Sequence, residues 1–228
     1  LAAALAAPVQ AKRTAVFPVK NFGSQLAPFY TILPLFVGSL LMAVTLKPGV
    51  SRKNREGLDN PKPHQLFLGH YGVFGVIALL QSTFSLGGNL LFLHVQAVHP
   101  WLFMLAGWTS SLVFSFFTYT MVASFGNVGK AIGVLVLVTQ ISGSNGAYPL
   151  AVLPKIISDI SPFLPATHSI VALRAAIAGI YNNDYWHALG SLLLFLIPLL
   201  LIGLVLRIPL VKFNKWYVAK VESTKVIS

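Results

Sequence analysis

Long uncharged apolar segments constrain this sequence more than any other feature. A transmembrane helix needs about 20 apolar residues, because the hydrocarbon core of a bilayer is about 30 Å thick and an α-helix rises about 1.5 Å per residue. Five segments of this kind cover residues 26–46, 71–95, 101–124, 128–146 and 188–206. The sequence therefore predicts an all-α polytopic membrane protein with five transmembrane helices.

The composition agrees with a membrane protein and argues against nucleic-acid binding. Hydrophobic residues make up 56% of the chain and charged residues only 9%, whereas a soluble domain carries roughly 25% charged residues. The net charge of +11 alone would suit a nucleic-acid partner, but no basic face interleaved with stacking aromatics is present. We expect the lipid bilayer, and no nucleic acid, as a partner.

The basic residues lie between and after the apolar segments, which predicts the orientation of the chain. Eleven of the 16 Lys and Arg residues fall on one side, in residues 47–62, at Lys130 and in residues 207–228. Loops rich in Lys and Arg remain in the cytoplasm. We therefore expect a cytoplasmic tail at 207–228, and we expect residues 1–25 to be the end of an extracytoplasmic segment. The start at Leu1, without Met, indicates the C-terminal part of a longer protein.

Residues 148–187, between the fourth and fifth spans, are too polar and too rich in proline for a simple span. Pro154, Pro162 and Pro165 divide this stretch, and apolar residues recur in it at helical spacing. It is predicted to form a hairpin of two short helices that lies on the outer membrane surface or dips into it. These three prolines and Arg174 form a candidate external gate.

Arg174 is the one charge in an otherwise apolar amphipathic segment. A charge near hydrocarbon needs a partner or a route to the interface. Arg174 is expected to snorkel to lipid head groups or to pair with Asp159 or Asp184. The alternative is a contact with a transported substrate.

Polar residues interrupt the second and fourth spans, and four of them, Gln81, Ser85, Gln140 and Asn145, are candidates for lining a translocation path. The complete polar set is Gln81, Ser82, Thr83, Ser85, Gln140, Ser142, Ser144 and Asn145. Such residues equally form hydrogen bonds between transmembrane helices. The residues alone favour neither role over the other.

Signals for catalysis, cofactors or metals do not form a coherent site. The chain has no Cys, and its six His residues lack a paired metal-ligand spacing. Gly126, Gly129 and Lys130 superficially resemble a phosphate loop, but the spacing is wrong and Ala131 replaces the required Ser or Thr. We expect no enzyme activity, no cofactor and no metal.

Short motifs in a fixed order carry a family resemblance. They are Asn21-Phe-Gly, Leu26-Ala-Pro-Phe-Tyr, Leu35-Phe-Val-Gly, Tyr148-Pro-Leu-Ala-Val-Leu-Pro, Ile160-Ser-Pro-Phe-Leu-Pro-Ala-Thr, Leu173-Arg and Ile177-Ala-Gly. With these motifs the chain resembles the phage infection protein (Pip, YhgE-like) family of ABC-2 type permeases. Members of that family have an N-terminal transmembrane helix, a long extracellular region and then a five-span block like this chain.

The resemblance implies export or secretion-related transport across the bacterial cell membrane. It places Arg52, Lys53 and Arg55 in a cytoplasmic loop that couples the permease to a separate ATPase subunit, and it implies a homodimer. The alternative is a membrane anchor or scaffold without transport of its own. Such an anchor would serve a type VII secretion system or a bacteriophage receptor, with secretion components or a phage bound through an external domain.

Overall fold

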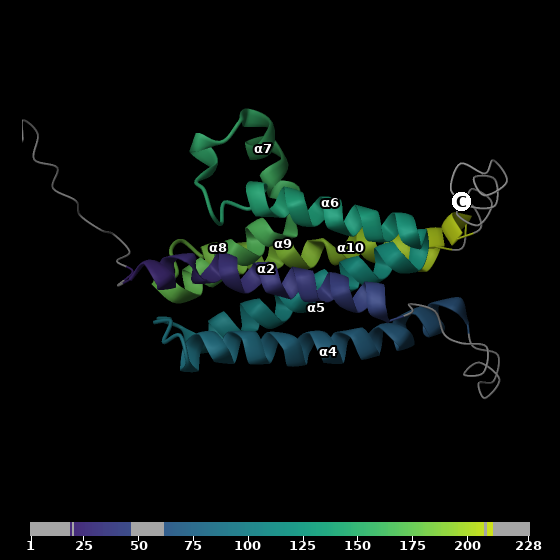
Figure 1. Cartoon of the computed structure of the whole chain (residues 1–228), viewed down its shortest axis with the longest axis horizontal. Coiled ribbons are helices and arrows are strands. Elements are labelled where there is room, and N and C mark those ends of the chain that lie inside the picture. Colours follow the sequence, from purple (N-terminus) through teal and green to yellow (C-terminus); the bar gives the residue numbers. More distant parts are fainter. Residues whose placement is uncertain (1–18, 20, 47–61, 208, 212–228) are drawn as a thin grey trace, which may run out of the picture.

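The computed structural model describes residues 19, 21–46, 62–207 and 209–211, and every regular element in these ranges is helical. The long helices are α2 (Phe22–Thr45), α4 (Pro63–Leu91), α5 (Pro100–Phe125) and α6 (Asn127–Gly143), and α9 (Asp184–Leu194) begins a fifth long helical stretch. Figure 1 shows them running side by side along one axis, with α2 between α6 and α4. The predicted all-α polytopic fold is confirmed.

Four stretches of the described chain are long and apolar enough to cross a membrane. They are Phe22–Thr45, Pro63–Leu91, Pro100–Phe125 and Asp184–Leu206. Large apolar side chains such as Phe84 and Leu135 are 80% and 66% exposed on the outside of the bundle. Lipid tails solvate such a surface, and water does not.

The fourth predicted span, residues 128–146, corresponds to the shorter helix α6. This helix has 17 residues and ends at Gly143, three residues before the end of the predicted segment. It follows α5 directly at Gly126, whose φ of 60° lies in the left-handed region that favours glycine. A Cβ at Gly129 would collide with the Met121 carbonyl, and one at Gly133 would lie 2.7 Å from Leu40 Cδ1. Small residues therefore bring α6 close to α5 and α2.

The region predicted as a hairpin contains two helices that differ in their surroundings. It comprises η1 (Leu150–Val152), α7 (Lys155–Ile160), η2 (Ser161–Phe163) and α8 (Pro165–Ala178). The segment Lys155–Phe163 meets α8 at an angle of 80°. Figure 1 shows α7 standing out from the side of the bundle next to α6, while α8 returns among the long helices.

The helix α8 belongs to the core of the bundle. Ile170, Leu173 and Ala176 are each 0% exposed. The amides of Val98 and His99 donate hydrogen bonds of 3.1 and 2.9 Å to the carbonyls of Ile177 and Ala176. These bonds join the end of α8 to the connection between α4 and α5. Proline explains the break before α8, because Pro165 fits the first turn of a helix and cannot continue a preceding one.

The helix α5 is the centre of the bundle and contacts α2, α4, α6, α8 and α9. Two buried clusters lie along it. One contains Phe36, Phe103 and Ile170, and the other contains Phe67 and Phe74 packed on Tyr119. The Tyr119 hydroxyl donates a 2.8 Å hydrogen bond to the Phe67 carbonyl, so its polar atom is paired inside an aromatic cluster.

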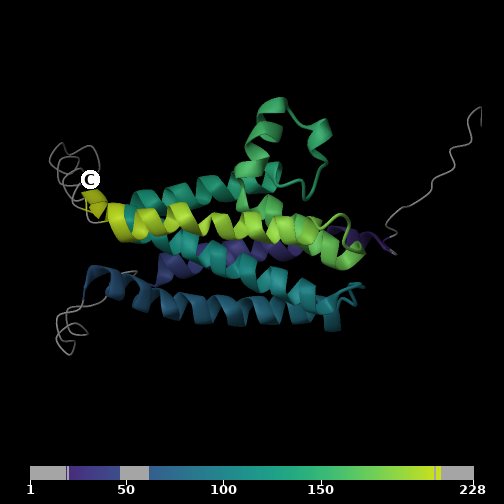
Figure 2. The same cartoon turned by 180° about the vertical axis from the view of Figure 1, so that it is seen from behind.

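The last span is interrupted in its middle, near Pro198. α9 ends at Leu194, the short α10 (Leu196–Leu200) follows, and η3 (Leu201–Leu206) continues as a π-helix. Pro198 has no amide hydrogen, and its ring crowds the carbonyl of Leu194, four residues earlier. Figure 2 shows this span in yellow-green, running the length of the bundle toward the C-terminus.

Candidate functional site

The predicted path-lining residue Gln81 joins two helices. Its Nε2 atom donates a 3.1 Å hydrogen bond to the Pro34 carbonyl of α2. The same side chain lies so close to Gly38 that a Cβ there would collide with it. Ser85 lies one turn further along α4 and is half-buried. The sequence allowed two roles for Gln81, lining a path or bonding between helices. Its contacts support the bond between helices.

Other polar residues of α2, α4 and α5 also bond across helices. Asn89 Nδ2 donates to Thr31 Oγ1 at 2.7 Å, and Ser111 Oγ donates to the Ala78 carbonyl at 2.8 Å. Trp108 Nε1 donates to Thr83 Oγ1 at 2.9 Å. Such bonds contribute about 0.6 kcal/mol each in membrane proteins. The polar side chains on α4 thus help to hold three helices together.

Gln140 and Ser144 lie one helical turn apart near the end of α6 and differ from the polar residues of α4. They are 3% and 1% exposed. Gln140 Nε2 and Ser144 Oγ have no hydrogen-bond partner within the described part of the chain. Buried polar atoms without partners are uncommon in native structures, and each needs an explanation. The i, i+4 spacing on one helix face could have singled out Ser144 together with Gln140.

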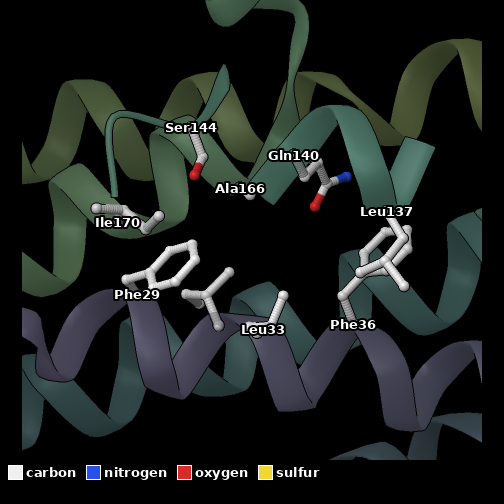
Figure 3. A pocket seen from close by; sticks show the side chains of 9 residues that line it. Phe29, Leu33, Phe36, Leu137, Gln140, Ser144, Ala166 and Ile170 are labelled. Atoms are coloured by element: carbon white, nitrogen blue, oxygen red, sulfur yellow. The ribbon is translucent and has the colours of Figure 1, made fainter. Parts of the chain in front are cut away.

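Both side chains point into a small cavity between α2, α6 and α8, which Figure 3 shows. Its volume is about 10 Å³, enough for about one water molecule. The remaining lining is almost entirely apolar: Phe29, Ile32, Leu33, Phe36, Leu137, Ala166 and Ile170. The cavity therefore combines two unpaired polar groups with an apolar wall.

Asn145, the fourth predicted path residue, has a local structural role. Its φ of 56° lies in the left-handed region, and its Oδ1 accepts a 3.3 Å hydrogen bond from the Leu150 amide. Asn tolerates this conformation because its short polar side chain bonds to nearby backbone. Asn145 is absent from the lining of the cavity. The structure thus places Gln140 at the cavity and Asn145 in the loop that follows α6.

Gly146 connects this loop to Arg174. A Cβ on Gly146 would collide with Phe29 and would lie 2.9 Å from Ile170 Cδ1, so glycine is needed for this close approach. The Gly146 carbonyl accepts a 3.2 Å hydrogen bond from Arg174 Nη2. Since Phe29 and Ile170 also line the cavity, Arg174 binds the residue that packs directly against the cavity wall. The sequence did not indicate this role of Gly146.

Among the described residues, neither carboxylate proposed as a partner of Arg174 is bonded to it. Asp184 Oδ1 accepts hydrogen bonds of 3.1 and 2.8 Å from the amides of Tyr181 and Tyr185. Asp159 is exposed on α7. Arg174 is half-buried, and its guanidinium carries five N–H donors. Most of those donors remain for lipid head groups, water or a ligand.

The three hairpin prolines occupy the ends of short helices. Pro154 precedes α7, Pro162 lies in η2 and Pro165 begins α8. His168 Nε2 lies 2.8 Å from the Pro162 carbonyl. The prolines thus set the bends of the hairpin, and a gating role for them stays a prediction.

The predicted coupling residues Arg52, Lys53 and Arg55 lie outside the described residues, as does most of the predicted cytoplasmic tail. Arg207, at the start of that tail, is described, and its guanidinium carbon lies 5.2 Å from the centre of the Phe67 ring. That distance is a cation–π contact. It places Arg207 at the end of the bundle where α4 begins.

A second, larger cavity lies on the side of the bundle, with a volume of about 270 Å³. Its lining is Leu68, Tyr71, Leu112, Phe116, Leu196 and Leu200. The one hydroxyl among these side chains is already bonded, because Tyr71 donates to the Leu112 carbonyl at 2.9 Å. This groove suits a hydrocarbon chain and offers no free polar group for a specific ligand. Within the described ranges, no group of three or more metal-ligating side chains comes together.

The fold defines an integral membrane protein of the polytopic α-helical class. Its features are apolar helices, hydrogen bonds between them and a helix that turns back into the bundle. A sequence profile of the ABC-2 family transporter proteins matches residues 1–205. The chain belongs to that family, which consists of membrane components of transporters.

One similar curated protein is the uncharacterized protein YhgE of Bacillus subtilis (strain 168). It is 30% identical over 190 residues, which are 82% of this chain and 23% of YhgE. The chain thus spans about a quarter of the length of this relative. The resemblance to YhgE-like ABC-2 permeases is confirmed. No solved structure matches the chain.

Proposed function

We propose that this chain is the membrane domain of an export permease that moves an amphipathic substrate across the bacterial cell membrane. The observation that carries the proposal is the ABC-2 transporter match over residues 1–205, which includes all described spans except the last residue of the fourth. The lining of the small cavity, with two unpaired polar groups beside apolar side chains, has the mixed character that a path for an amphipathic molecule needs. Two copies of the chain would form the complete path.

Energy for export would come from a separate ATPase. The glycine-rich residues that superficially resemble a phosphate loop lie where α5 ends and α6 begins, and Lys130 lies in the first turns of α6. A phosphate loop instead presents consecutive backbone amides to a nucleotide. The basic loop with Arg52, Lys53 and Arg55 is the proposed contact for the ATPase, because it lies on the side with the most Lys and Arg.

The test reverses the charge of this loop. We expect R52E, K53E and R55E together to abolish export while the protein remains in the membrane. Export is measured by mass spectrometry, comparing the amphiphiles at the surface of cells that contain the wild type, the variant or no permease. The matched control is K215E, K220E and K225E, which makes the same charge change in the tail and should leave export intact.

The same experiment addresses the anchor hypothesis. The length of YhgE supports that hypothesis. The match covers 23% of YhgE, so the remaining 77% of that relative lies outside the matched region. An anchor does not need an ATPase contact. An unchanged surface profile in the R52E, K53E and R55E variant would therefore contradict the coupled permease and favour the anchor.

A further inference from the structure

We propose that Arg174, Ser144 and Gln140 form a binding site for the anionic group, a phosphate or a carboxylate, of an amphipathic molecule. This inference rests on the proposed export function and deepens it, because it assigns a charge to the substrate. The three side chains come from the end of α6, the loop after it and the core helix α8.

The first step in the argument concerns the two buried groups. Gln140 Nε2 can only donate hydrogen bonds, and the Ser144 hydroxyl can donate one. Both atoms are buried and unpaired within the described chain, and both side chains line one cavity. An unpaired buried donor destabilises a protein. A ligand that brings acceptor atoms would remove this penalty at both positions.

The second step concerns the positive charge beside them. Arg174 stays protonated at every relevant pH. Within the described residues, its hydrogen-bond partner is the Gly146 carbonyl at 3.2 Å. Gly146 packs against Phe29 and Ile170, and these two side chains form part of the cavity wall. Arg174 is thus bonded to a residue that packs against the cavity wall, and most of its five N–H donors remain available for further acceptors. Arg is well suited to bind phosphate or carboxylate through two parallel hydrogen bonds.

The third step concerns the rest of the ligand. Phe29, Leu33 and Leu137 present carbon atoms to the cavity, so the molecule bound there would have an apolar part next to its anionic group. A cavity of about 10 Å³ holds about one water molecule. The anionic group would therefore reach Gln140 and Ser144 when α6 moves away from α2 and α8. Arg174, which is half-buried, is accessible before that movement.

Binding of soluble short-chain lipids tests the site without transport. The purified chain in a neutral detergent is titrated with dioctanoyl phosphatidylglycerol, which is anionic, and with dioctanoyl phosphatidylcholine, which is zwitterionic. We expect the wild type to bind the anionic lipid about tenfold more tightly, the factor that about 1.4 kcal/mol represents. R174Q should remove this preference, and S144A or Q140L should weaken anionic binding about fivefold.

The matched control is K155Q, which removes an exposed cation from α7 in the same hairpin. It should leave the preference for the anionic lipid unchanged. R174K keeps the charge but loses the two parallel hydrogen bonds, so it should retain part of the preference. This variant keeps the proposal testable if R174Q does not fold. Equal binding of both lipids by the wild type, or equal loss in K155Q and R174Q, would overturn the proposal.

Inorganic phosphate identifies the source of the anion. Competition by millimolar phosphate would assign the site to a free anion, whereas binding of the anionic lipid without such competition would assign it to a lipid-like head group. Either result supports an anion site. Because the titration needs neither an ATPase nor export, its failure would leave the proposed function standing. Conversely, failure of the coupling-loop test would leave this binding result intact.

Discussion

Individual glycines determine how closely the helices of this bundle approach. Gly146 packs its Cα against Phe29 and Ile170, and Gly129 packs against the backbone of α5. Other glycines, such as Gly72 on α4, have open space where a Cβ would stand. Gly129 and Gly133 are four residues apart on one helix, a spacing that is typical of close helix approach. The sequence could not predict the approach at Gly146, because that residue lies in a loop whose partners come from distant helices.

Replacing Gly146 with Ala should destabilise the protein by about 1–3 kcal/mol, because the added methyl group overlaps the Phe29 ring in a packed region. Thermal unfolding in detergent measures the change. Gly72→Ala is the control, since its Cβ meets nothing within 4 Å and Ala favours a helix over Gly. An unfolding temperature for G146A equal to that of G72A would show that the loop after α6 does not pack as described.

The elements differ in how well the sequence predicts them. Apolar runs located the long spans, because hydrophobic length is a direct consequence of bilayer thickness. The start of α4 at Pro63 precedes the predicted start at 71 by about two turns, since the polar first residues of this helix extend beyond an apolar segment. The buried position of α8 could not be predicted, because an apolar helix face packs equally well against lipid or protein.

Likewise, the sequence did not show which polar side chains would form hydrogen bonds to a neighbouring helix. Gln81 and Asn89 on α4 form such bonds, and Gln140 Nε2 has no partner within the described residues.

The buried position of α8 predicts a contrast between the two helices of the hairpin. Leu173→Ala should cost about 2 kcal/mol or more of unfolding free energy, because Leu173 is 0% exposed and its removal leaves a cavity. Ile156→Ala on α7, where Ile156 is 65% exposed, should change stability by less than about 0.5 kcal/mol. Chemical denaturation in detergent compares the two. Equal effects would mean that α7 and α8 share one environment, as two surface helices would.

At the scale of the whole molecule, the asymmetry of basic residues relates the bundle to the cell. The end of the bundle where α4 begins also holds Arg207. In the sequence, the basic residues of 47–61 come shortly before α4, and those of 212–228 come after Arg207. The opposite end holds the connection between α4 and α5 and the end of α8. If the positive-inside rule applies, the proposed anion site faces the outer half of the membrane.

Reporter fusions test this orientation. Green fluorescent protein fused after Ser228 should fluoresce, and alkaline phosphatase fused there should be inactive, because we expect the C-terminus in the cytoplasm. The control is a truncation fused after Gln96, between α4 and α5, where alkaline phosphatase should be active and the fluorescent protein dark. Phosphatase activity at Ser228 would reverse the assignment of both ends of the bundle.

The length of α6 has a consequence for the lipid around it. A helix of 17 residues spans about 25 Å, a few ångströms less than the hydrocarbon core of about 30 Å. Bilayers adapt to such hydrophobic mismatch by thinning locally. Next to α6 the bilayer is therefore expected to be thinner, so that lipid phosphates come closer to the ends of this helix. The membrane itself would then carry an anionic amphiphile part of the way to the site.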